Sequence, residues 1–281
     1  MTDLPRPFIV AVITDRATDG AICSMRAAAL DGAHAFEINL PLYPLAAPGD
    51  LAALFAATGR PAYTTCRRAA FMPVYGIPAA DLPAWSDEER IERQLAMIPA
   101  GSRAIDIEMD TFDPCPLPPE AAVSPDSGPP GELTRDPGAV RRQAEAARAA
   151  KSAGASVFLS CHTGRPQTID SLLAIARIAV ERGADLLKIV TPCTAPAHLY
   201  DVLEASRRLA GRLPIPYTII GAGPAGDLSR LIGVNFGCGW VIAQPALTPG
   251  GFHPQPLVSQ AREVLRLMPW RAPAGESLSC A

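Results

Sequence analysis

Lysine is rare in this chain, and one of its two lysines interrupts an apolar segment. Among 25 basic residues only Lys151 and Lys188 are lysines, and Lys188 lies within the segment 184–190. A lysine that faces inward from a buried strand is desolvated, which lowers its pKa and makes the neutral amine available. Such an amine attacks a ketone to form a Schiff base that acts as an electron sink. A buried ion pair of Lys188 with Asp106 or Glu108 explains the position equally well from the residues alone.

A histidine follows the apolar segment that precedes the lysine along the chain. His162 ends the stretch 156–161, which we expect to form the strand next to that of Lys188. An iminium at Lys188 would acidify the adjacent carbon, and an imidazole could remove that proton and later protonate a leaving group. Lysine and histidine on adjacent strands therefore indicate β-elimination or aldol-type chemistry on a carbonyl compound. Arg67 and Arg230 would bind a substrate carboxylate.

Short apolar segments, typical of buried parallel strands, alternate with amphipathic segments along the whole chain. The expected strands cover residues 8–14, 35–40, 62–66, 104–109, 156–161, 185–190, 216–220 and 237–242. The expected helices cover residues 22–30, 51–58, 87–98, 138–153, 168–182, 195–213, 228–232 and 256–267. Eight strand–helix pairs predict a single-domain α/β protein, a (β/α)8 TIM barrel. A doubly wound sheet is the alternative, but the turn at 15–20 lacks the G-x-G-x-x-G pattern.

Composition and boundaries limit the function classes. We expect the barrel to span residues 1–268, with a proline-rich insertion at about 113–131 and a tail at 269–281. A net charge of −3 gives no reason to expect a nucleic-acid partner or an anionic membrane surface. No apolar stretch approaches the ~20 residues of a membrane span, and residues 1–7 lack the pattern of a signal peptide. We therefore expect a cytoplasmic enzyme or binding protein.

Polar residues gather where the expected strands end. Active sites of TIM barrels lie at the carboxyl ends of the strands, so side chains from different strands should meet there. The residues of this set are Glu37, Asn39, Arg67, Asp106, Glu108, His162, Lys188 and Arg230. Each has an ordinary structural explanation when it is considered alone, such as a helix cap or an ion pair. Their expected convergence on one end of the barrel favours a functional site.

The same residues carry a resemblance to a known family. The segments are Phe36-Glu37-Ile38-Asn39, Thr65-Cys66-Arg67, Ile105-Asp106-Ile107-Glu108, Ser160-Cys161-His162, Gly183-Ala184-Asp185-Leu186-Leu187-Lys188-Ile189, Gly226-Asp227-Leu228-Ser229-Arg230 and Asn235-Phe236-Gly237-Cys238. In this order, from about residue 8 to 268, the chain resembles type I 3-dehydroquinate dehydratase. The resemblance implies a TIM barrel, commonly dimeric, that needs no metal or organic cofactor and acts in the shikimate pathway.

The resemblance also implies roles for individual residues. Lys188 matches the Schiff-base lysine, His162 the general acid/base, and Arg230 the arginine that binds the substrate carboxylate. Polar residues that line the family's substrate site are matched by Glu37, Arg67, Asp106 and Glu108, and Thr248 matches its closing loop. The implied reaction removes water from 3-dehydroquinate, a β-hydroxy keto acid, and the implied assembly is a homodimer.

The chain departs from the family at residues that contact the substrate. Asn39 and Pro41 stand where the family has an arginine and an acid, Phe71 replaces a glutamate near the histidine, and Gly251 replaces a glutamine. The residues for the chemistry are kept while several residues that hold the substrate hydroxyls are lost. Because hydrogen-bonding groups decide which polar analogue a site accepts, we expect a Schiff-base lyase whose substrate is 3-dehydroquinate or a related β-hydroxy keto acid.

Two other functions remain open from the sequence. Glu37, Asp106, Glu108 and His162 could bind a divalent ion in a metal-dependent isomerase or aldolase, with Lys188 as an electrostatic partner. The chain could also be a non-catalytic barrel that binds carboxylate metabolites. Reductive trapping and chelation distinguish the three functions.

Overall fold

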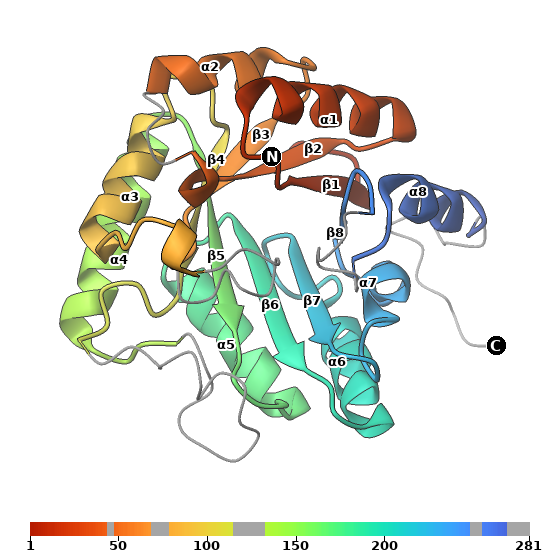
Figure 1. The fold of residues 1–281 in the computed structure, drawn as a ribbon. Helices are drawn as coiled ribbons and strands as arrows, with labels where there is room; N and C mark the ends of the chain where they lie inside the picture. Colours follow the sequence, from red (N-terminus) through yellow and green to blue (C-terminus); the bar gives the residue numbers. More distant parts are fainter. Residues whose placement is uncertain (44–47, 69–78, 115–132, 248–254, 269–281) are drawn as a thin grey trace.

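Eight parallel strands form a nearly closed barrel in the computed structural model, which describes residues 1–43, 48–68, 79–114, 133–247 and 255–268 (Figure 1). The strands are β1 (Phe8–Ile13), β2 (Ala35–Asn39), β3 (Ala62–Thr65), β4 (Ala104–Glu108), β5 (Ser156–His162), β6 (Leu186–Pro192), β7 (Tyr217–Ala222) and β8 (Trp240–Ala243). Their order is β7-β6-β5-β4-β3-β2-β1-β8, and every pair is parallel. The prediction of a TIM barrel is confirmed.

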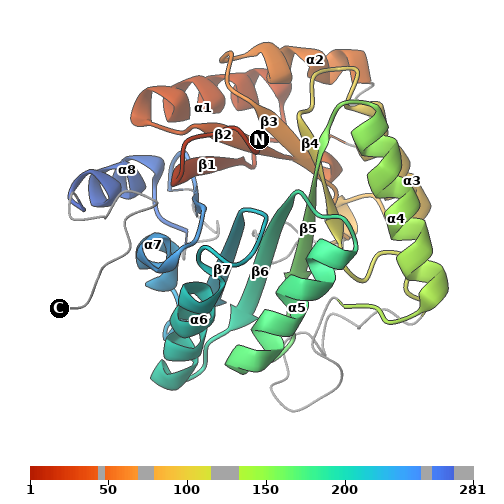
Figure 2. The same ribbon diagram turned by 180° about the vertical axis from the view of Figure 1, so that it is seen from behind.

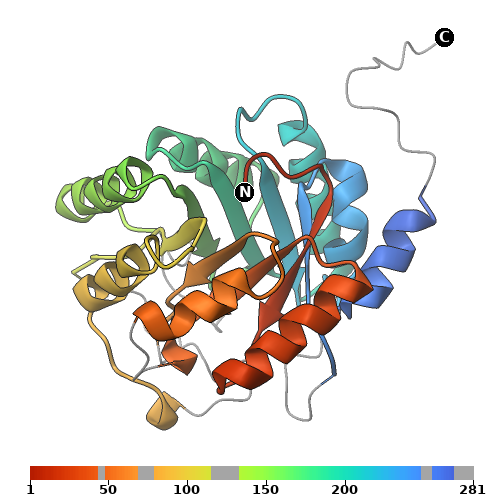
Figure 3. The same ribbon diagram turned by 90° about the horizontal axis from the view of Figure 1, so that it is seen from above.

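Helices cover the outside of the barrel, as Figures 1 and 2 show from opposite sides and Figure 3 shows from above. They are α1 (Thr18–Asp31), α2 (Pro48–Ala56), α3 (Asp87–Ala96), α4 (Pro137–Ser152), α5 (Ile169–Glu181), α6 (Pro196–Leu209), α7 (Ser229–Ile232) and α8 (Val258–Arg266). Short 3-10 turns lie at η1 (Leu40–Leu42), η3 (Ala79–Asp81) and η4 (Gly233–Phe236). No helix within the described residues is long and apolar enough to cross a membrane.

The barrel closes at β8, which contacts β1 on one side and β7 on the other. β8 pairs with β1 from Phe8–Trp240 to Ala11–Ala243. Between β7 and β8, the Gly239 amide donates to the Tyr217 carbonyl over 2.7 Å, and Thr218 Oγ1 donates to the Trp240 carbonyl over 3.2 Å. These bonds join the edge strands where a regular ladder is missing.

Alternate residues of each strand point into the barrel, because side chains in a strand alternate between its two faces. The inner cluster is apolar at the amino ends of the strands, where Phe158 meets the Trp240 ring edge to face at 5.6 Å. Met1 and Leu4 pack against this cluster. The other, larger core lies between the strands and the helices. The amino end of the barrel is therefore filled with apolar side chains, and the inward positions nearer the carboxyl ends are the polar ones.

The strand boundaries lie within two residues of the predicted segments except at β8, which begins at Trp240 and not at residue 237. Gly237 ends η4 with a φ of 108°, in the left-handed region, so it is a turn residue. A Cβ at this position would lie 2.5 Å from the Tyr217 hydroxyl, which excludes any side chain there. The predicted proline-rich insertion lies mostly, and the predicted tail entirely, outside the described residues.

Candidate active site

Lys188 lies inside the barrel between two carboxylates that come from other strands. Its Nζ donates to Asp106 Oδ2 on β4 over 3.1 Å and lies 3.7 Å from Glu37 Oε2 on β2. All three residues are at most 6% exposed. Each occupies an inward position of its strand, so the two-residue period of the strands accounts for their meeting. A lone amine at this depth would be desolvated, and the two carboxylates compensate its charge.

A tyrosine joins the apolar interior to this polar group. Tyr63 on β3 is 1% exposed and stacks on Phe158, with ring centroids 4.5 Å apart. Its hydroxyl donates a short hydrogen bond to Glu37 Oε2, the same oxygen that lies nearest to Lys188. Glu37 is therefore held from below by a tyrosine while it faces the lysine.

His162 and Arg67 contact each other nearer to the carboxyl ends of the strands, at the mouth of the barrel. Arg67 Nη1 lies 2.8 Å from His162 Nδ1 and donates to Glu108 Oε1 over 2.9 Å. The second oxygen of Glu108 accepts a short hydrogen bond from Arg90 on α3. Both oxygens of Glu108 thus contact arginines, so this carboxylate orients Arg67 beside the histidine.

The arginine contacts of Glu108 continue outward through an ion-pair network. Asp87, the first residue of α3, accepts from Arg90 Nη1 over 2.6 Å and from Arg68 Nη2 over 2.9 Å. Arg68 also pairs with Asp110 Oδ2 at 2.7 Å. Burial opposes the charge of Asp87, but the hydrogen bonds from Arg68 and the charges of both arginines outweigh it and lower the pKa of its carboxyl. The network fixes the start of α3 against the ends of β3 and β4.

Arg230 lies in the turn that follows β7. It is 6% exposed on α7, and its Nε is 3.8 Å from Asp227 Oδ1. Burial raises the pKa of the Asp227 carboxyl, and the charge of Arg230 offsets part of that effect. Ser229 Oγ accepts from the Gly221 amide over 2.8 Å, which ties the start of α7 to the end of β7.

Cysteines next to these residues are poor nucleophile candidates. Cys66 immediately precedes Arg67, and burial raises the pKa of its thiol to about 12. Cys193 follows β6, and burial raises the pKa of its thiol to about 11. Because the thiolate is the reactive form, these thiols stay protonated and unreactive at neutral pH.

Most of the predicted site residues fall in the described part of the chain. The structure brings together Glu37, Asp106 and Lys188, and separately Arg67, Glu108 and His162. Asn39 and Pro41 are described and buried at the end of β2. Thr248, Phe71 and Gly251 lie outside the described residues.

Sequence reasoning missed Tyr63 and Arg90. Tyr63 on β3 lies four residues before Arg67, which follows the strand, and this even spacing was an available signal that both side chains point to the same face. Arg90 stands among acidic residues in α3, a pattern typical of a solvated helix face. Its contact with Glu108 depends on how the helix packs against the barrel, which the local pattern does not contain.

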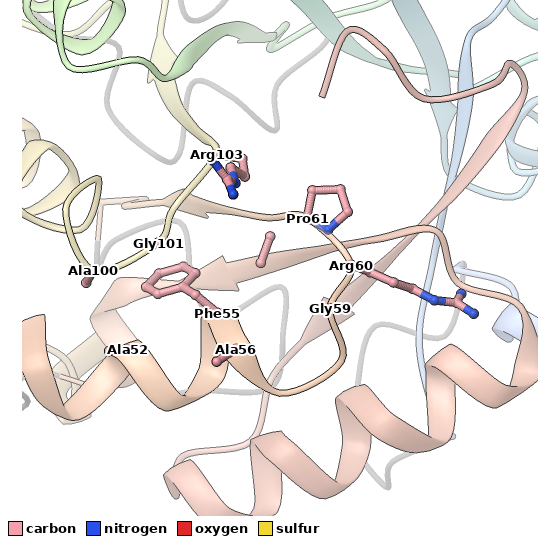
Figure 4. Close-up of a pocket in the computed structure, with 10 residues that line it drawn as sticks. Ala52, Phe55, Ala56, Gly59, Arg60, Pro61, Ala100, Gly101 and Arg103 are labelled. Carbon is pink, nitrogen blue, oxygen red and sulfur yellow. The ribbon is translucent and has the colours of Figure 1, made fainter.

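A separate pocket of about 410 Å³ lies at the opposite end of the barrel (Figure 4). Its lining includes Phe55, Pro61 and Gly101, next to the amino ends of β3 and β4. Figure 4 shows the Arg60 side chain pointing away from the Phe55 ring, so the charged group of Arg60 does not lie against the apolar part of the pocket. It has no contact with the polar residues around Lys188.

Carboxylates and imidazole do not form a metal site in the part of the chain that the structure describes. Within it, no three His, Cys, Asp or Glu side chains gather closely enough to hold a metal ion. Glu37, Asp106 and Glu108 instead contact Tyr63, Lys188 and two arginines. The geometry gives the metal-dependent alternative no ligand set among these residues.

Comparison with known proteins identifies the family. Residues 9–269 match the sequence profile of type I 3-dehydroquinase. The chain belongs to the type I 3-dehydroquinase family. The match spans all eight strands of the barrel, in agreement with the predicted extent of the resemblance.

Solved structures of family members share this fold. The 3-dehydroquinate dehydratase of Geobacillus kaustophilus HTA426 has a TM-score of 0.72 and 18% identity, covering 95% of this chain and 93% of that one. The type I enzyme of Clostridium difficile has a TM-score of 0.70 and 17% identity, covering 94% and 93%. The dehydratase of Enterococcus faecalis has a TM-score of 0.68 and 18% identity, covering 95% and 96%. No curated protein sequence matches the chain. At these identities the 3-dehydroquinate dehydratase structures establish the barrel, and the chain's own residues must carry the argument about chemistry.

Proposed function

We propose that this type I 3-dehydroquinase family member is a Schiff-base lyase that removes water from a β-hydroxy keto acid. The observation that carries the proposal is the buried amine of Lys188 between the Asp106 and Glu37 carboxylates. A buried amine is available as a nucleophile when a neighbouring group accepts its proton. Asp106 Oδ2, at 3.1 Å, is within reach of that proton.

The reaction follows from these groups in balanced steps. The neutral amine of Lys188 attacks the ketone carbon, and the carbonyl oxygen leaves as water with both amine hydrogens. The proton that Asp106 accepted from the lysine returns to the nitrogen, which gives an iminium, and hydrolysis of the iminium releases that proton again. His162 removes a proton from the carbon next to the iminium and passes it to the β-hydroxyl, which leaves as a second water. Hydrolysis of the iminium consumes one water and releases the product and Lys188. One water is lost overall.

The carboxylates beside the lysine support the charged intermediate. An iminium nitrogen carries a positive charge, and fixed carboxylates in a water-poor interior stabilise it strongly. Asp106 Oδ1 and Ser160 Oγ are buried without a hydrogen-bond partner among the described residues. Buried polar atoms are normally paired, so these two atoms suit a substrate hydroxyl or a water that accompanies it. Ser160 is the β5 register partner of Lys188.

Arginines supply the means of binding the acid group. Arg230 is the proposed partner of the substrate carboxylate, and Arg67, beside His162, faces the reacting carbons. Because Asn39, Pro41, Phe71 and Gly251 replace family residues that hold the substrate, we propose that the accepted compound differs from 3-dehydroquinate in its hydroxyl groups or that 3-dehydroquinate is turned over slowly. Thr248 as a substrate contact, a cytoplasmic location and a homodimer remain predictions.

Reductive trapping tests the proposal. The protein is incubated with borohydride and each member of a panel of cyclic and linear β-hydroxy ketones that includes 3-dehydroquinate, and intact mass is measured. We expect a stable adduct on the Lys188 peptide with the accepted compounds and no adduct in Lys188→Met. Normal turnover by Lys188→Met, or turnover by the wild type without any trapped adduct, would contradict the Schiff base.

A further inference from the structure

Glu37 Oε2 is shared between two possible partners in the barrel interior. The Tyr63 hydroxyl donates a short hydrogen bond to it, and Lys188 Nζ lies 3.7 Å away. Hydrogen bonds between nitrogen and oxygen normally extend to about 3.2 Å. The lysine therefore lies at ion-pair distance from the oxygen that the tyrosine holds, but beyond hydrogen-bond distance.

The tyrosine is well placed to fix this arrangement. Its ring stacks on Phe158 at 4.5 Å in the apolar layer, and the side chain is 1% exposed. The register partner of Tyr63 on β2 is Glu37 itself, and the same apolar cluster includes Ala35 on β2 and Ala104 on β4. Apolar packing thus holds the Tyr63 ring in place while its hydroxyl donates to the Glu37 carboxylate.

A direct contact between Glu37 and Lys188 would work against the chemistry of the amine. An opposite charge favours the charged form of a lysine, and the effect grows as the distance shortens; an ammonium has no electron pair for attack on a ketone. Asp106 already contacts Nζ at 3.1 Å. A second carboxylate at the same distance would hold the ammonium form more firmly.

We propose that Tyr63 is a positioning residue that draws the Glu37 carboxylate away from Lys188 and so keeps the lysine amine reactive. This proposal adds a residue to the proposed Schiff-base function and acts through Glu37, not on the substrate. The carboxylate then stays near enough to stabilise a positive nitrogen after the Schiff base has formed.

Few other groups can set the reactivity of Lys188 within the described residues. The titratable and charged side chains of the site around it are Glu37 on β2, Tyr63 on β3, Arg67 after β3, Asp106 and Glu108 on β4, His162 on β5, and Arg230 on α7, which follows β7. Arg67 and Glu108 contact each other, and Glu108 also contacts Arg90. On β7 the register partner of the lysine is Thr218, which does not titrate.

Cyanate tests the proposal without any knowledge of the substrate. This small reagent carbamoylates neutral amines, and the chain has only two lysines, so peptide mass spectrometry compares Lys188 with Lys151 in one sample. Rates are measured from pH 6 to 10 in the full-length protein. Lys151 pairs with Asp185 on the surface and serves as the internal reference.

Two of the variants are chosen because they should change the carbamoylation rate of Lys188 in opposite directions. In Tyr63→Phe, which keeps the ring stacking, we expect Lys188 to react about tenfold more slowly, with the pH profile moved up by about one unit, the order of shift that a contacting opposite charge produces. In Glu37→Gln we expect faster reaction and a profile at lower pH. The double variant should behave as Glu37→Gln does, because Tyr63 acts through the carboxylate.

Tyr217→Phe is the matched control. Its hydroxyl donates to the Ser206 carbonyl over 2.5 Å in the buried layer outside the strands. We expect it to lose stability without changing the reaction of Lys188. A slower rate in Tyr217→Phe equal to that in Tyr63→Phe would mean that general loosening is responsible, and the proposal would be wrong.

Two further outcomes overturn the inference. An unchanged pH profile in Tyr63→Phe would mean that the hydroxyl does not govern the amine, and a slower rate in the double variant than in Glu37→Gln would mean that Tyr63 acts by another route. Reductive trapping with 3-dehydroquinate is run in parallel. If the cyanate rates change as expected but no adduct is trapped, the Schiff-base function is contradicted for that compound. The role of Tyr63 is then still supported.

Discussion

Both oxygens of the Glu108 carboxylate are paired with arginines at the mouth of the barrel. Sequence analysis expected it to line the substrate site, and in the structure Arg67 and Arg90 contact both of its oxygens. Glu108 and Arg90 are each 3% exposed, so little water remains to solvate either charge. The carboxylate is therefore best understood as the group that orients Arg67 towards His162.

Removal of Glu108 should be costly because it leaves buried arginines without their partner. For Glu108→Leu we expect the free energy of unfolding to fall by about 3–5 kcal/mol, the range for breaking a buried ion pair, measured by urea denaturation. Glu263→Gln is the control, since the Glu263–Arg266 pair is exposed and its loss should not be measurable. Equal stability of Glu108→Leu and the wild type would show that Arg67 and Arg90 find other partners.

The turn between β7 and α7 positions Arg230, and glycine is required in it. A Cβ at Gly226 would lie 2.6 Å from Cys193 Cβ and 2.8 Å from the Gly221 carbonyl carbon. The second contact is with backbone, which a rotamer change cannot relieve. Gly226 lies four residues before Arg230, so the close approach of this turn to the residues that follow β6 sets where α7 begins, at Ser229.

Gly226→Ala should displace this turn and weaken both folding and ligand binding. We expect a loss of about 1–3 kcal/mol in the free energy of unfolding, as for overpacked cores, together with weaker binding of carboxylate ligands measured by calorimetry. Gly49→Ala in α2 is the control, since nothing lies within 4 Å of its Cβ position and alanine favours helix. A Gly226→Ala protein with wild-type stability and binding would mean that the turn adapts without moving Arg230.

The sequence predicted which side chains share one face of a strand, because this follows from the local periodicity. The two-residue period of a strand puts Glu37 and Asn39, or Asp106 and Glu108, on the same face, and parallel order brings these faces together. The pairing of Glu108 with Arg90 was not predictable, because a long side chain from a helix reaches over two strands only in the assembled barrel. The link from Tyr63 to Glu37 was missed because an aromatic residue within a strand usually indicates packing.

The two ends of the barrel have different chemistry. At the amino end, apolar side chains of residues 1–7 pack against the inner cluster, while at the carboxyl end the polar residues surround Lys188. The pocket beside Phe55 belongs to the amino end, so it is separated from the polar residues by the filled interior (Figure 4). The apolar inner cluster therefore fills one end, and the candidate chemistry lies at the other.

We expect a half-buried histidine at the amino end to make the stability of the molecule depend on pH. His34 Nδ1 accepts from the Ile9 amide over 3.1 Å, and the His34 amide donates back to the Ile9 carbonyl over 2.8 Å. Burial, aided by the charge of Arg60, lowers the pKa of His34. Protonation would place a proton on the nitrogen that accepts from Ile9, so the folded state takes up that proton less readily than the unfolded chain.

The direction of the pH effect follows from linkage. The unfolded chain binds this proton near the ordinary value of about 6.5, so the contribution of His34 to stability is complete above that pH and is lost as the pH falls towards the lowered folded pKa. We expect the free energy of unfolding of the wild type to fall between pH 7 and pH 5.5. His34→Asn keeps an acceptor near the position of Nδ1 without a titrating group, so its stability should decline less over the same interval, measured by urea denaturation at each pH. If the free energies of unfolding of the two proteins fall in parallel with pH, other groups cause the acid sensitivity. If the two curves converge at low pH, the His34 imidazole at the amino end of the barrel couples folding to proton binding.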